Sequence, residues 1–164
     1  MFSLFSFFMN AQTENSVQIL EGQPARGCGN FMVLRKVRFE EKNNTFIILD
    51  FNAANLKLSP KFKKFKISNA KNIKVKAEIL NTEFEDNYCT DALSPNVEVL
   101  QSLTIENGTI YVRKIKDESM PGYQFRTPYR VEVILKNAWF LKDGKKYLIP
   151  EIKFKNVLVG YMMG

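Results

Sequence analysis

Residues 72–80 read Asn-Ile-Lys-Val-Lys-Ala-Glu-Ile-Leu, and this stretch decides the fold. Apolar and polar side chains alternate from Asn72 to Ile79, with Ile73, Val75, Ala77 and Ile79 on one face and Asn72, Lys74, Lys76 and Glu78 on the other. A period of two residues is typical of a β-strand with one buried face, because successive side chains of a strand point to opposite sides. The pattern predicts that the isoleucine face lies in the core and the lysine face in solvent.

Working outward from this strand, the chain holds further short β-rich runs separated by turn signals. The strands are expected at residues 31–39, 45–51, 97–106, 109–116, 129–136, 139–141, 147–149 and 152–159. Asn107-Gly108 and Asp143-Gly144 predict tight hairpins, since both central residues of a type I′ turn need positive φ. Residues 40–44 predict a longer connection, Asn156 a bulge, and Trp139 a core position.

About eight or nine short strands, without a convincing helical period, predict an all-β fold. We expect an antiparallel, immunoglobulin-like β-sandwich, with a closed β-barrel as the alternative. Its single domain is expected over residues 27–164. The polar stretch 12–26, which contains Gly22 and Pro24, is expected to be a flexible leader.

The first eleven residues carry no charge and are rich in Phe, Leu and Met. The apolar run is too short for a membrane span, which takes about 20 residues, but it matches the apolar region of a signal peptide. No Lys or Arg precedes the run, which departs from the usual signal-peptide pattern. Residues 1–11 are therefore interpreted as a signal peptide of an exported, periplasmic or extracellular protein with no membrane span. The alternative is an apolar N-terminal strand or a frayed tail that belongs to the fold.

The two cysteines agree with export. In an oxidising compartment, two cysteines form one bridge without ambiguity of connectivity, so we expect Cys28 and Cys89 to be disulfide-bonded. The alternative is a pair of unrelated buried thiols in a cytosolic protein.

The composition excludes several classes of catalytic and metal site. The 164 residues include no histidine, which excludes His-dependent triads and His-ligated zinc. Neither a phosphate-binding glycine loop nor a nucleophile elbow is present. No cofactor, metal or catalytic residue is therefore predicted, and an enzyme would have to work with carboxylates alone.

Charge is unevenly distributed along a chain of net charge +7. Residues 56–77 hold eight lysines and no acid, whereas residues 78–98 hold six acids and no base. The basic block could contact a polyanion, or it could be a solvated face that discourages edge pairing. The candidate contacts are Lys61, Lys63, Lys64, Lys66, Lys74 and Lys76, within a stripe from Lys57 to Lys76. The acidic block, from Glu83 to Asp91, has the oxygen ligands of a calcium site but lacks the spacing of an EF-hand.

Four segments of the chain carry a resemblance that supports the expectation of export. The start ending in Asn10-Ala11-Gln12, the segments 27–31 and 88–91, and the closing residues 154–161 together resemble small exported bacterial β-sandwich proteins of unassigned function. The resemblance implies fold and export and adds no site.

The expected function is that of a non-enzymatic binding or scaffolding domain of a bacterial envelope, because binding specificity on a rigid β frame lies in its loops. Its partner would be a protein or glycan of the cell envelope, and nucleic acid is not expected. The alternatives are a carboxylate-only hydrolase acting on glycans and a weak polyanion binder.

Overall fold

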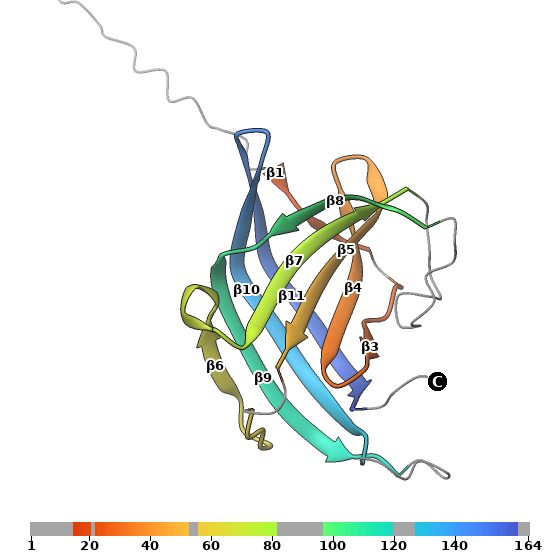
Figure 1. The fold of residues 1–164 in the computed structure, drawn as a ribbon, viewed down its shortest axis with the longest axis vertical. Coiled ribbons are helices and arrows are strands. Elements are labelled where there is room, and N and C mark those ends of the chain that lie inside the picture. Colours follow the sequence, from red (N-terminus) through yellow and green to blue (C-terminus); the bar gives the residue numbers. More distant parts are fainter. Residues whose placement is uncertain (1–14, 21, 53–55, 82–96, 120–126, 161–164) are drawn as a thin grey trace, which may run out of the picture.

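A computed structural model describes residues 15–20, 22–52, 56–81, 97–119 and 127–160. Apart from the short 3-10 turn η2 (Ile67–Asn69), the regular structure of these residues is β-strand (Figure 1). None of their elements is a helix long and apolar enough to cross a membrane.

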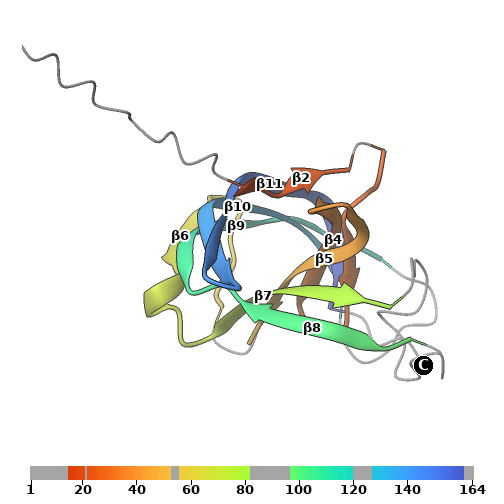
Figure 2. The ribbon, with the colours of Figure 1, turned by 90° about the horizontal axis from the view of Figure 1, so that it is seen from above.

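The strands form two sheets that pack face to face (Figure 2). In the order of hydrogen-bonded neighbours, sheet A contains β1 (Asn15–Ser16), β11 (Lys145–Val159), β10 (Tyr129–Lys142), β9 (Asn107–Asp117) and β6 (Lys63–Lys66). Sheet B contains β2 (Gln18–Ile19), β4 (Met32–Phe39), β5 (Lys42–Phe51), β7 (Ile73–Leu80) and β8 (Val99–Thr104), with β3 (Arg26–Cys28) paired to β4. Except for the short parallel β1–β11 contact, the pairing is antiparallel. The expected all-β sandwich is therefore confirmed.

The core lies between the sheets and consists of alternate side chains from both. Ile47 and Leu49 of β5 and Val133 and Leu135 of β10 belong to this core, and all four are fully buried. On β7, Ile73, Val75, Ala77 and Ile79 are buried as predicted, while Lys74 is exposed.

The outer face of sheet B carries a second apolar cluster, made of Cys28, Leu34, Phe46, Ile48 and Leu80. Glu78, on the same side of β7 as Leu80, is consequently buried, and its carboxylate lies 2.5 Å from the Lys76 ammonium. The polar face of β7 is therefore only partly solvated.

The hairpin expected at Asn107-Gly108 is wrong. β8 pairs with β7 in sheet B, whereas β9 begins at Asn107 in sheet A, so the chain changes sheets between them. The buried Ile105 fills this corner, and its N–H donates to the Val75 carbonyl at 2.9 Å. Gly108 is needed for another reason, because a Cβ there would lie 2.8 Å from the Ala138 Cβ.

Trp139 does not lie in the core, contrary to expectation. β10 runs unbroken from Tyr129 to Lys142, and the register against β9 shifts between Lys136 and Trp139. Asn137, at φ 50°, occupies this shift, so that Ala138 and Phe140 face inward and Trp139 faces outward. One extra residue in a strand exchanges the faces of all residues beyond it.

Two local predictions, one of a turn and one of a bulge, are confirmed. Asp143 (φ 51°) and Gly144 (φ 74°) form the two-residue turn between Lys142 and Lys145, which are paired. Asn156 (φ 53°) lies at the bulge where the β10–β11 register shifts. The connection between β4 and β5 is shorter than the expected residues 40–44, because Phe39 already pairs with Lys42.

The N-terminal segment contributes to both sheets in its described part. The region expected as a leader supplies β1 to sheet A and β2 to sheet B, with the buried Val17 between them. The expected signal peptide, residues 1–11, lies outside the described residues.

Candidate functional site

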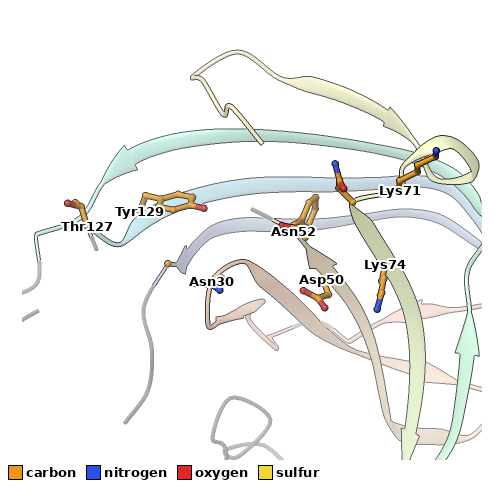
Figure 3. A pocket seen from close by; sticks show the side chains of 10 residues that line it. Asn30, Asp50, Asn52, Lys71, Lys74, Thr127 and Tyr129 are labelled. Carbon is orange, nitrogen blue, oxygen red and sulfur yellow. The ribbon is translucent and has the colours of Figure 1, made fainter. Parts of the chain in front are cut away.

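A pocket of about 750 Å³ opens at the end of the sandwich where β5 and β11 finish and β7 and β10 begin (Figure 3). We call it the end pocket. Its volume falls within the usual range for small-molecule sites, roughly 300–1,000 Å³. Its lining residues come from five separate segments of the chain: Asn30, Asp50, Phe51, Asn52, Lys71, Asn72, Lys74, Thr127, Tyr129 and Gly160.

An aromatic layer underlies the pocket. The rings of Phe31 and Phe51 stack at a centroid distance of 4.3 Å, and Tyr129 meets Phe31 edge-on at 6.1 Å. Phe31 and Phe51 are almost fully buried and anchor this layer in the core. The pocket therefore has a rigid apolar floor.

Gly160 sets the position of Tyr129. Its φ is +82°, and a Cβ there would lie 3.0 Å from the tyrosine ring. Its N–H donates to the Gly29 carbonyl at 2.9 Å, which ties the end of β11 to the turn before β4. Only glycine combines this backbone conformation with so close an approach.

Backbone hydrogen bonds join the segments of the rim. The Phe51 N–H donates to the Phe31 carbonyl at 2.9 Å, and the Asn52 N–H donates to the Asn72 carbonyl at 2.8 Å. Asn52 and Asn72 of the rim therefore stand on paired backbone.

The side chains of the rim are hydrogen-bonding and mixed in charge. Asp50 and Lys74 are directly opposite each other on β5 and β7, and Lys71 lies just before β7. In Figure 3, Tyr129 reaches from β10 toward Asn52 on the opposite side. Among the described residues that line the pocket, Asp50 is the sole carboxylate. The arrangement offers amide and hydroxyl groups beside the aromatic rings, with the Asp50 carboxylate and the Lys74 ammonium on the outer side of sheet B (Figure 3).

A second cavity of about 520 Å³ opens at the side, between η2, β7 and β8. Its floor consists of core side chains, among them Ile73, Val75 and Ile105. The end pocket is the larger of these two and holds more polar side chains.

The lysines predicted to contact a polyanion are divided between the sheets. Lys63, Lys64 and Lys66 lie on β6, which pairs with β9 in sheet A, and Lys61 precedes that strand. Lys74 and Lys76 lie on β7 in sheet B. The six residues therefore do not form one continuous stripe along paired strands, and Lys74 instead lines the end pocket.

Two further candidates depend on segments outside the structure's description. Cys28 is buried on β3, but Cys89 lies among residues 82–96, so the Cys28–Cys89 disulfide stays a prediction. The calcium candidate, from Glu83 to Asp91, lies in the same segment. Within the described ranges, no three His, Cys, Asp or Glu side chains gather as a metal site would require.

Sequence reasoning missed the end pocket. Its polar residues stand at strand ends, in stretches such as Gly29-Asn30, Asp50-Phe51-Asn52 and Lys71-Asn72. Asparagine at strand ends is a detectable signal, but it is also the ordinary composition of turns. What distinguishes these residues is their convergence, which depends on how the two sheets are superposed.

Comparisons with models of protein families, with curated proteins and with solved structures find no match to this chain.

Proposed function

We propose that this protein is an exported, non-enzymatic binding domain that takes a hydroxylated ligand, such as a saccharide, in the end pocket. The observation that carries the proposal is the convergence of polar side chains from four segments around one pocket that aromatic rings border. Amide and carboxylate groups hydrogen-bond to hydroxyls, and a ring accommodates the apolar side of a ligand.

The carboxylate content of the described pocket lining favours binding over hydrolysis. Retaining and inverting glycosidases generally need two carboxyl groups at a defined separation. The described lining supplies Asp50 together with the cations Lys71 and Lys74, a set better suited to holding a ligand than to protonating a leaving group.

The experiment is an NMR titration of the full chain with a panel of mono- and disaccharides, including uronic acids. We expect amide shifts at Asn52, Asn72 and Tyr129. For the ligand that binds best, Asp50→Asn and Lys74→Ala should each raise Kd about tenfold, equivalent to about 1.4 kcal/mol. The matched control is Lys145→Ala, at the opposite end of the sandwich, which should leave Kd unchanged.

The proposal fails if no member of the panel shifts the pocket amides, or if Lys145→Ala weakens binding as much as Lys74→Ala. Release of hydrolysed sugar that Asp50→Asn abolishes would establish the carboxylate hydrolase instead.

A further inference from the structure

The outer face of sheet A carries an excess of positive charge that the end pocket does not involve. On β9, β10 and β11 the outward side chains are those that alternate with buried Ile110, Val112, Val133, Leu135 and Phe154. Seven cations on this side of sheet A, two of them exposed lysines of β6, are together called the basic face. They are Lys64, Lys66, Arg113, Lys136, Lys146, Lys153 and Lys155. Two acids, Glu132 and Glu151, lie among them.

Both acids are already neutralised by members of the face. The Glu151 carboxylate lies 2.6 Å from the Lys136 ammonium and 2.8 Å from that of Lys153. Glu132 accepts hydrogen bonds from the Arg113 Nε at 2.8 Å and Nη2 at 2.5 Å. Neither acid is therefore available to cancel the remaining lysines.

Four lysines of the basic face keep their charge exposed. Lys64, Lys66, Lys146 and Lys155 are solvent-exposed, and none forms an ion pair with a carboxylate of the described residues. Such a surface attracts polymers of negative charge and binds them with release of counterions.

Aromatic rings hold several of these cations in place. The Lys146 ammonium lies 4.8 Å from the centroid of Trp139, and the Arg113 guanidinium 4.6 Å from that of Phe62. The ammonium groups of Lys64 and Lys136 lie 5.8 Å and 6.0 Å from the centroid of the Tyr111 ring. Cation–π contacts of this length restrain a flexible lysine without neutralising it.

The same contacts indicate which polymer the face fits. Proteins that bind single-stranded nucleic acid offer open aromatic rings on which bases stack. Here each of the three rings already has a cation over it, so the groups presented to a ligand are ammonium and guanidinium. This favours a polymer recognised by its carboxylates or sulfates.

The dimensions favour a chain over a small ion. Lys64, Tyr111, Ile134 and Lys153 form one row across four strands, about 14 Å wide at about 4.8 Å per strand. Along β11, Lys146 and Lys155 are about 30 Å apart at about 3.3 Å per residue. We propose that the basic face binds an acidic polysaccharide laid along sheet A, independently of the end pocket.

The test measures binding of the full chain to polygalacturonate, heparin and oligothymidylate by calorimetry at about 50 mM and about 200 mM salt. We expect binding to the two glycans, weaker at the higher salt. A triple variant, Lys64→Glu, Lys66→Glu and Lys155→Glu, should weaken glycan binding more than about tenfold. The control triple, Lys42→Glu, Lys57→Glu and Lys145→Glu, changes the net charge equally but lies off the basic face and outside the end pocket, and it should retain most of the affinity.

Circular dichroism and melting temperature establish that both triples fold. The proposal is overturned if neither glycan binds at the lower salt, or if the two folded triples lose affinity equally. Tighter binding of oligothymidylate than of both glycans would make nucleic acid the occupant and would also overturn it. The saccharide titration of the end pocket, with Asp50→Asn, can succeed or fail separately.

Discussion

At the scale of single residues, the neighbouring strands β9 and β10 of sheet A approach each other closely where glycine is required. Gly108 has φ +127°, and a Cβ there would lie 2.8 Å from the Ala138 Cβ, whereas Gly144 has φ +74° with open space around it. Gly108→Ala combines backbone strain with overpacking and should cost about 2–4 kcal/mol. Gly144→Ala adds strain alone, about 1–2 kcal/mol. Urea unfolding of both variants checks this, and equal losses would contradict the steric argument.

A second residue-scale contact closes the sandwich at the end opposite the pocket. The Tyr147 hydroxyl donates to Glu40 Oε1 at 2.8 Å, and the Lys142 ammonium lies 3.1 Å from the same oxygen. The Tyr147 hydrogen bond, followed by that of Lys142, lowers the pKa of the Glu40 carboxyl. Tyr147→Phe should therefore raise that pKa, measurable by NMR titration of the carboxyl carbon.

The sign of the stability effect follows from the lowered pKa of Glu40. The ionised Glu40 carboxylate contributes to the stability of the folded protein above the pKa of about 4.3 that it has in the unfolded chain. This contribution is lost as the pH falls through the pKa that Glu40 has in the folded protein. The difference in melting temperature between the wild type and Tyr147→Phe should shrink as the pH is lowered below about 4. A difference that stays constant through this range would show that the hydroxyl acts through packing alone.

At the scale of elements, the extra residue in β10 determines what the outer face of sheet A presents. Because Asn137 shifts the register, Trp139 is half-buried beneath Lys146 rather than packed in the core. It is the one tryptophan of the chain, so its fluorescence reports on this site alone. We expect acrylamide to quench the native emission, at a rate below that of the urea-unfolded chain. Lys146→Ala should increase the quenching, whereas a native protein that resists acrylamide would place Trp139 in the core.

At the scale of the whole molecule, the two sheets differ on their outer faces. Sheet A is charged, whereas sheet B carries the apolar cluster that contains Cys28. A bridge from Cys28 to Cys89 would tie the segment after β7 to this cluster and close a loop of about 60 residues, worth about 4 kcal/mol in the chain-entropy account. Non-reducing peptide mapping of protein produced in an oxidising compartment should show one linked pair. Two freely alkylated thiols would refute the bridge.

By itself, the sequence determined that the fold is all-β, where the long strands lie and which side of most of them is buried, but it did not predict β1, β2, β3 or β6. The alternation at 73–79 and the turn at Asp143-Gly144 are local patterns, so they could be predicted without knowing the partners of either segment. The bulge at Asn156 was equally local.

Tertiary structure decided the rest, because pairing between distant strands is not encoded in a local pattern. Asn107-Gly108 has a hairpin sequence, but packing of Ile105 carries the chain from one sheet to the other. The Asn137 bulge turns Trp139 outward, and pairing of β6 with β9 separates Lys64 from Lys74. The end pocket and the basic face both arise from these long-range choices, since each gathers side chains from strands far apart in the chain.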